Sequence, residues 1–361
     1  MRIRHWLDPR PVLRRAATRA RVAAGGKKKI NLALQGGGAH GAFTWGVLDH
    51  ILDDGRLAIE GISGASAGAV NAVMLADGFT EGGTAGARAA LRAYWQEVSR
   101  AAALSPLQRS PLDRMMGRWS LDTSPAYVAM DLMSRLLSPY DLNPLAYNPL
   151  RNILTQCIDF ERLARSPIKL FVTATNVRTG RGRVFRNGEI TPDVLLASAC
   201  LPTMFQAIEI DGESYWDGGY SGNPTITPLV RECHSHDTIL VQINPVERAG
   251  SPRSARDILN RLNEVSFNAV LLKELRMIAL LRQVAHSNDC ESAKWAEMRI
   301  HRVSSEVMVG LGYSSKLNAE WEFLCMLRDE GRRAAQAFLT DHHEDLGRRS
   351  SLDLDELLEG V

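Results

Sequence analysis

Residues 57–76 read LAIEGISGASAGAVNAVMLA, and this stretch is the strongest indication of the fold. It begins with a short apolar run, Leu57 to Ile62, which is typical of a buried strand, and it ends in a helix-like run. Between them lies Gly64-Ala65-Ser66-Ala67-Gly68, a serine flanked by small residues. This is the layout of a nucleophile elbow, whose sharp turn needs glycine where a side chain would collide. A serine at such a helix N-terminus meets free N–H groups that favour a developing negative charge.

A second strand and a glycine-rich turn precede this elbow. Residues 30–34 are apolar, the cluster Gly36-Gly37-Gly38-Ala39-His40-Gly41 follows, and residues 43–52 have the apolar spacing of a helix. This β-α-β-α order favours an α/β fold with a parallel sheet covered by helices. We expect further strands at 169–175, 183–185, 237–243 and 298–303, and further amphipathic helices at 87–99, 254–284 and 315–340.

The glycine cluster fits two functions. Gly36, Gly38 and Gly41 satisfy the G-x-G-x-x-G pattern of a dinucleotide site, which also needs an acidic residue at the end of the next strand. Glu60 is near that place, but the chain then runs directly into the serine turn. The glycine cluster and the serine turn are so close together that they favour a single site. In that site the N–H groups of Gly37 and Gly38 would stabilise the oxyanion formed when Ser66 attacks an ester.

The composition sets limits on the class of protein. Of the 361 residues, 45% are hydrophobic and 23% are charged, which is typical of a globular chain, and the net charge of +2 is too small to indicate a nucleic-acid partner. The five cysteines have no paired spacing, so we expect reduced thiols. No segment is apolar enough to predict a membrane span, and we expect a cytoplasmic protein, peripheral at a membrane or lipid surface.

Four regions flank or interrupt the expected catalytic domain, residues 30–245. Residues 1–29 form a basic extension, which is a solvated arm, a segment that contacts anionic lipid or an organelle-targeting segment. Residues 101–150 are rich in proline and methionine and are interpreted as a helical insertion. That insertion is a candidate lid over an acyl chain, although methionines at helical spacing also suit plain core. Residues 246–340 add helices and a strand to the same domain, and residues 341–361 form an acidic tail.

A nucleophilic serine needs a general base, and the histidines provide no clear one. None of the nine has a setting that identifies a triad, and none is spaced with acids as a metal site. Asp217-Gly218-Gly219 follows a short strand candidate, residues 213–216, and would present a carboxylate in an open cleft. In isolation this would be an ordinary Asp-Gly turn.

These motifs together resemble the patatin-like phospholipase family. The segments that carry the resemblance occur in order: residues 35–41, 64–68, 197–202 (ASACLP) and 217–219. The resemblance covers about residues 30–245, and the rest of the chain is supported more loosely by bacterial members. It implies a three-layer α/β/α sandwich and hydrolysis of phospholipid or neutral-lipid esters through an acyl-enzyme, with no metal or cofactor.

The resemblance also implies residue roles. Ser66 would be the nucleophile and Asp217 its base, in a dyad without histidine. Gly36, Gly37 and Gly38 would supply oxyanion donors, while Gly41, Gly64, Gly68, Gly218 and Gly219 would support the turns. Position 40 departs from the family, whose members commonly carry Arg or Lys where this chain has His40. A neutral His40 weakens the inference of a phospholipid substrate.

Two other hypotheses stay open at this stage. The first is an α/β-hydrolase-type esterase whose triad is Ser66, Asp217 and either His286 or His301. The second is a non-catalytic protein of the same fold that binds lipid surfaces or polymer granules. The sequence leaves the ester substrate and the oligomeric state undetermined.

Overall fold

The computed structural model describes residues 26–284 and 290–356. Its centre is a mixed, mostly parallel sheet in the order β5-β6-β3-β2-β1-β7-β8, with β4 pairing β3 beside this path. The strands are β1 (Lys28–Leu34), β2 (Leu57–Gly64), β3 (Lys169–Asn176), β4 (Gly182–Arg186), β5 (Ile208–Ile210), β6 (Glu213–Asp217), β7 (Asp237–Val241) and β8 (Arg299–Val303). Strands β3, β2, β1, β7 and β8 run parallel, and β4, β5 and β6 are antiparallel additions.

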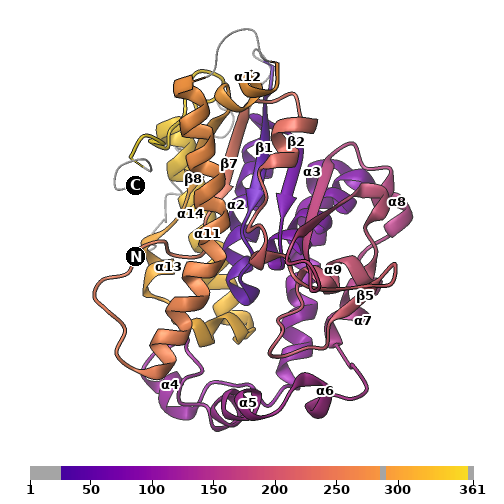
Figure 1. The fold of residues 1–361 in the computed structure, drawn as a ribbon, viewed down its shortest axis with the longest axis vertical. Helices are drawn as coiled ribbons and strands as arrows, with labels where there is room; N and C mark the ends of the chain where they lie inside the picture. The colour runs from indigo at the N-terminus through magenta and orange to yellow at the C-terminus, as the bar shows by residue number, and fades with distance from the viewer. Residues whose placement is uncertain (1–25, 285–289, 357–361) are drawn as a thin grey trace, which may run out of the picture.

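Helices cover both faces of the sheet (Figure 1). The longer ones are α2 (Gly41–Asp54), α3 (Ala67–Ala103), α5 (Pro125–Leu136), α7 (Pro149–Cys157), α9 (Pro192–Ser198), α11 (Ala255–Val284), α12 (Cys290–Ala296) and α14 (Trp321–His342). The shorter ones are α4 (Pro111–Met115), α6 (Pro139–Leu142), α8 (Phe160–Ala164), α10 (Thr227–Glu232) and α13 (Glu306–Gly310). Four 3₁₀ turns complete the list: η1 (Gly38–His40), η2 (Asn187–Glu189), η3 (Gly218–Tyr220) and η4 (Tyr313–Leu317).

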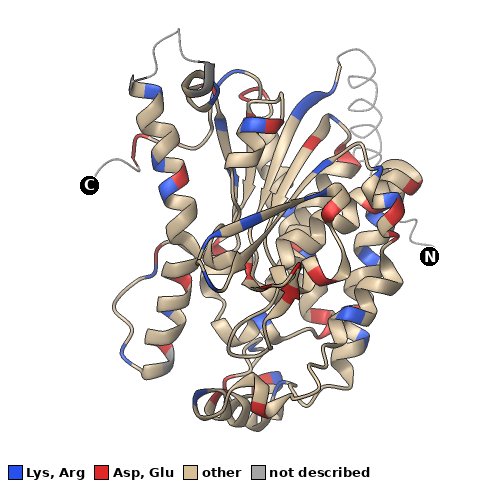
Figure 2. Cartoon of the chain, turned by 45° about the vertical axis from the view of Figure 1, so that its right-hand side comes forward, with Lys and Arg blue, Asp and Glu red and all other residues tan. Residues whose placement is uncertain are grey.

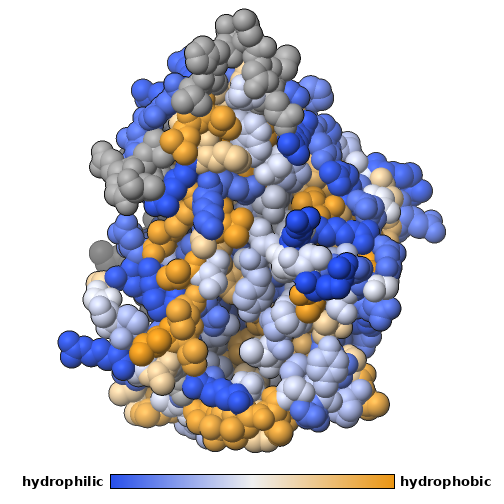
Figure 3. Space-filling model, viewed as in Figure 1, coloured by the Kyte–Doolittle hydropathy of each residue, from blue (hydrophilic) through white to orange (hydrophobic). Residues whose placement is uncertain are grey.

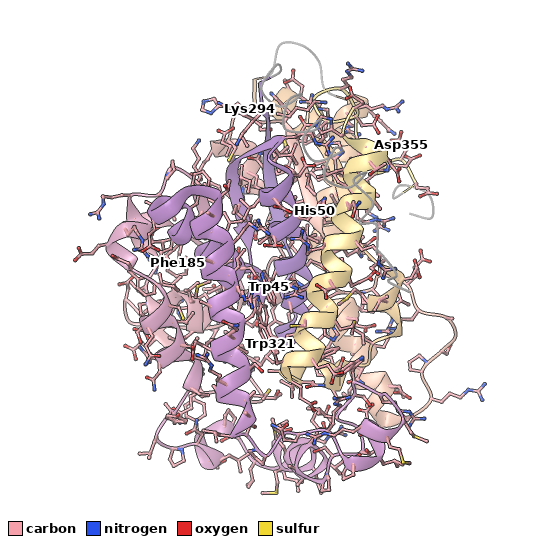
Figure 4. All side chains as sticks on the ribbon, turned by 180° about the vertical axis from the view of Figure 1, so that it is seen from behind. Trp45, His50, Phe185, Lys294, Trp321 and Asp355 are labelled. Carbon is pink, nitrogen blue, oxygen red and sulfur yellow. The ribbon has the colours of Figure 1, made fainter. Side chains whose placement is uncertain are left out.

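The alternation of side chains along β1 explains the two helical layers. Leu32 and Leu34 point into one hydrophobic cluster, and Ala33 points into the other. Helices α2, α3 and α14 cover the first face, as Figure 4 shows from behind, and Trp45 of α2 lies against Trp321 of α14 with ring centroids 6.0 Å apart. Helices α10, α11 and α12 cover the second face. The predicted three-layer α/β/α sandwich is confirmed.

Most expected elements are present, with shifted boundaries. The helices expected after the serine and at 87–99 join into α3, which is broken where Gly82 and Gly83 leave helical geometry. The strand expected at 237–243 ends at Val241. The last helix begins at Trp321, six residues later than expected, because residues 313–317 form a 3₁₀ turn instead. No described helix has the length and apolarity needed to cross a membrane.

The insertion is a set of short helices at the base of the molecule in Figure 1, where α4, α5 and α6 follow the end of α3. Prolines begin all three helices, and the side chains of Ser110 and Ser138 cap α4 and α6. Arg109 pairs with Glu320 in the segment before α14, and Trp119 stacks on Phe323. The insertion is therefore anchored to the C-terminal part of the chain.

Candidate active site

Ser66 occupies a strained turn between β2 and α3. Its φ of 51° lies in the left-handed region, which a residue other than glycine adopts at a cost of about 1–3 kcal/mol. The flanking glycines make this turn possible. A Cβ at Gly64 would lie 2.7 Å from the amide nitrogen of Ala69, and one at Gly68 would collide with the carbonyl oxygen of Leu34. The Gly-x-Ser-x-Gly spacing thus has a steric cause at this turn.

Asp217 ends β6 and is 1% exposed. Its Oδ1 accepts a hydrogen bond of 2.7 Å from the Gly219 amide, and the Ser66 hydroxyl lies near enough to the carboxylate to lower its pKa. Burial raises the pKa of Asp217 to about 7, although the Gly219 amide, the Ser66 hydroxyl and the charge of Lys316 oppose the rise. The sequence therefore brings serine and aspartate into contact, and the aspartate is a stronger base than an ordinary carboxylate.

The two glycines after Asp217 are needed for close packing. A Cβ at Gly218 would collide with the carbonyl oxygen of Thr173, and one at Gly219 would collide with the ring of Phe267 on α11. The Asp-Gly-Gly turn is therefore wedged between the sheet and a helix, which fixes the direction of the carboxylate.

The segment at the end of α9 holds both residues in place. The Ser66 amide donates to the carbonyl oxygen of Ser198 (3.1 Å) and to its Oγ (3.0 Å), and this hydroxyl donates in turn to Thr173 on β3 (2.7 Å). The Asp217 amide donates to the carbonyl oxygen of Cys200 at 2.8 Å. These contacts give the Ala197–Pro202 segment a positioning role that the sequence did not reveal.

The three glycines after β1 differ in what their amides do. The Gly36 amide donates to Asn223 Oδ1 at 2.6 Å, so this amide is already engaged. Among the described residues, none accepts a recorded hydrogen bond from the amides of Gly37 or Gly38. Gly36 has another function, because a Cβ there would lie 2.6 Å from the Cβ of Ser66. Of the three expected donors, Gly37 and Gly38 therefore have amides available to a ligand, and Gly36 does not. Gly41 packs against α3, where a Cβ would lie 2.7 Å from that of Ala67.

A cavity of about 380 Å³ opens beside Ser66 and Asp217. Its walls are mainly apolar, as an acyl chain requires. They come from α3, from the ends of the insertion, from α7 and from the loop after α9, with Tyr94, Trp95, Val98, Ile153, Leu201, Met204 and Phe205 among them.

The structure gives His301, one of the two histidines considered for a triad, other partners. Nε2 of His301 lies 3.1 Å from Asp237 Oδ1 and Nδ1 lies 3.2 Å from Ser351. Asp237 begins β7, so this pair is at the amino edge of the parallel strands, whereas Ser66 follows the carboxyl edge. His301 is therefore not the third member of a triad, and His286 lies outside the described residues.

His40 is buried close to the glycine loop, and its Nε2 is 2.8 Å from Ser315 Oγ. Burial lowers its pKa well below the ordinary value, and the charges of Lys316 and Arg248 lower it further, so the ring is neutral. Among the described residues, no cluster of His, Cys, Asp or Glu is placed to hold a metal ion.

Three functional candidates were missed by sequence reasoning: Asn223, Asn244 and Lys316. Asn244 Nδ2 donates to the Gly36 carbonyl at 2.8 Å, and Lys316 Nζ donates to Asn244 Oδ1 at 2.8 Å. Asn223 and Asn244 lie in loops, Lys316 lies in η4, and none of the three belongs to a motif, so only folding shows that they surround the glycine loop.

Comparisons with known proteins give a family match. A family model described as patatin-like phospholipase matches residues 32–230, more than half of the chain. Among solved structures, VipD from Legionella pneumophila is similar with a TM-score of 0.39 and 16% identity, over 88% of this chain and 67% of that one. That likeness is too distant to support an argument about function. No curated protein matches the sequence.

Proposed function

Because this chain belongs to the patatin-like phospholipase family, we propose that it is a serine acyl hydrolase that cleaves lipid carboxylic esters through Ser66 and Asp217. The observation that carries the proposal is the buried Asp217 carboxylate, which lies beside the Ser66 hydroxyl in the wall of an apolar cavity. No described histidine competes for the role of base.

The first half of the reaction forms an acyl-enzyme. Ser66 Oγ attacks the ester carbonyl carbon while its proton passes to the Asp217 carboxylate. The carbonyl oxygen becomes an oxyanion and accepts hydrogen bonds from the amides of Gly37 and Gly38, each worth about 3–4 kcal/mol in comparable sites. The bond from the carbonyl carbon to the alcohol oxygen then breaks, and Asp217 returns the proton to the departing alcohol.

The second half releases the acyl group. A water molecule gives a proton to Asp217 and attacks the acyl carbonyl, and the same two amides hold the oxyanion. The bond to Ser66 Oγ breaks, Asp217 returns the proton to Ser66, and the free carboxylic acid departs. A base with a pKa of about 7 suits both transfers, because it is ionised near neutral pH yet accepts a proton readily.

We also propose that the enzyme works at a lipid surface, with the insertion in contact with it. Residues 104–147 carry four arginines and four aspartates, so the segment is neutral, and Figure 2 shows both signs on these helices. The same segment exposes many apolar side chains, and Figure 3 shows apolar surface at the base of the molecule. The most exposed are Leu104, Met115, Leu132, Leu136, Tyr140, Leu145 and Tyr147. The cavity opens where the insertion begins and ends. A neutral, apolar surface next to this opening fits uncharged or zwitterionic lipid.

The test is fluorophosphonate labelling together with ester hydrolysis. Ser66→Ala should abolish labelling and lower turnover by about 10³-fold or more, while the exposed Ser251→Ala serves as a matched control. Labelling or full activity in Ser66→Ala would refute the proposal. A protein that binds lipid granules without measurable hydrolysis would instead support the non-catalytic alternative.

A further inference from the structure

The cavity beside Ser66 contains a lysine that the proposed reaction does not use. Lys316 belongs to the turn Tyr313–Leu317, which lies directly on the glycine loop. A Cβ at Gly38 would be 2.5 Å from the Lys316 carbonyl oxygen, and Ser315 holds His40 on the other side of the loop. Lys316 therefore lines the cavity next to Gly37 and Gly38, the two proposed oxyanion donors.

The ammonium group has unused hydrogen-bonding capacity. It has three donors, and the bond to Asn244 Oδ1 at 2.8 Å uses one. Its Nζ also lies 5.1 Å from the ring centroid of Tyr313. No carboxylate in the described part of the chain forms a direct ion pair with it. The nearby Glu264 is already paired with Arg248 at 2.7 Å and with Arg261 at 3.1 Å.

Charge makes Lys316 distinctive in this cavity. Of the described residues that line it, only Asp217 and Lys316 are charged, and the neighbouring His40 is neutral. Burial lowers the pKa of Lys316 to about 8, so the side chain still carries its proton at pH 7. Lys316 is half-buried, and although the charges of Glu264 and Asp217 act on it, it has no direct ion pair with a described residue; a ligand that brought an anionic oxygen would offset its desolvation.

We propose that Lys316 binds the phosphodiester of a glycerophospholipid whose ester lies at Ser66, and that it thereby selects phospholipids over neutral glycerides. The inference rests on the function proposed above and adds the residue that would recognise the phosphate. In a glycerophospholipid a three-carbon backbone separates the phosphate from the acyl esters. An anion-binding group therefore has to lie beside the oxyanion donors, where Lys316 lies.

A purely structural role for Lys316 makes a different prediction. Through Asn244 the lysine also reaches the Gly36 carbonyl, so its loss could loosen the loop. That effect would weaken binding and cleavage of every ester equally. A specific role in phosphate binding changes the ratio between phospholipid and glyceride, and this ratio is the quantity to measure.

The experiment uses the full chain with a matched pair of short-chain ligands, dihexanoylphosphatidylcholine and dihexanoylglycerol. Dissociation constants are measured by calorimetry in the Ser66→Ala background, so that binding is read without catalysis. Lys316→Met should reduce the preference for the phospholipid by about ten- to a hundredfold, as expected for a hydrogen bond to a charged group. The exposed Lys273→Met should leave the preference unchanged.

Lys316→Gln provides a second variant, which removes the charge with less loss of polarity, and it should also reduce the preference. Inorganic phosphate, tested as a competitor, shows whether the site accepts free phosphate as well as the lipid headgroup. An unchanged preference, within threefold, in both Lys316 variants would overturn the proposal. These measurements need no turnover. An inactive wild-type protein would therefore refute the proposed hydrolase function, while the binding data would still decide whether Lys316 binds the phosphate.

Discussion

Replacing Asp217 by Asn should separate activity from stability. Asn has the same shape, its Oδ1 can still accept the Gly219 hydrogen bond, and its Nδ2 can donate to Ser66 Oγ. It has no proton-accepting carboxylate, so turnover should fall by about 10³-fold or more. At the same time Asn removes the cost of burying an ionised carboxylate, so the inactive variant should be more stable than the wild type at alkaline pH.

The size of the gain follows from the raised pKa. The pKa of Asp217 moves from an ordinary 3.8 to about 7 because the carboxyl is buried. One pKa unit corresponds to 1.36 kcal/mol, so complete ionisation lowers the free energy of unfolding by about 4 kcal/mol at most. The native state retains a proton that the unfolded state releases between these pKa values. The stabilising contribution is therefore present below about pH 4 and is lost as pH rises to about 7.

The assay is urea unfolding of the wild type and Asp217→Asn at several values between pH 4.5 and 8. Their difference in free energy of unfolding should grow with pH in favour of Asn, because contributions from all other groups cancel. The exposed Asp341→Asn is the matched control and should show no such trend. A difference that stays constant across this range would refute the claim that burial raises the pKa of Asp217.

Three further outcomes are expected. The kcat/KM for a soluble ester should rise about tenfold per pH unit up to about 7 and then level, since Asp217 must be ionised to accept the Ser66 proton; a profile that falls over this range would contradict the dyad. Gly219→Ala should abolish activity or folding because its Cβ would collide with Phe267, whereas Gly188→Ala, which has open space, should be tolerated; equal tolerance in soluble expression and activity assays would refute the steric argument. Leu136→Asp, at a side chain 72% exposed, should weaken sedimentation with phosphatidylcholine vesicles severalfold and leave hydrolysis of a soluble ester intact; unchanged sedimentation would exclude contact through α5.

Much of the geometry of the candidate site was predictable because it depends on glycine. At Gly64, Gly68, Gly218 and Gly219 a Cβ would collide with backbone or with a packed ring. Close packing of the backbone at these positions therefore requires glycine, which can be recognised in the sequence. The β-α-β-α order then places the carboxyl ends of β1 and β2 at one edge of the sheet, which brings the glycine loop to Ser66. Local spacing and strand order were therefore sufficient for Ser66 and its loop.

The donors and the cation could not be predicted in this way. Whether Gly36, Gly37 or Gly38 has a free amide depends on Asn223, which reaches Gly36 from a distant loop. Lys316 resembles any other lysine in the sequence, and it becomes a half-buried cation in the cavity wall only because residues 313–317 pack onto the glycine loop.

The sequence by itself determined the α/β sandwich, the nucleophile turn and the family, because these depend on short-range periodicity and on positions where only glycine fits. Tertiary structure decided which amides remain free, how deeply Asp217 is buried and which cation faces the cavity. These properties depend on burial and on electrostatic contacts between segments far apart in the chain. Such contacts produce no local sequence pattern from which they could be predicted.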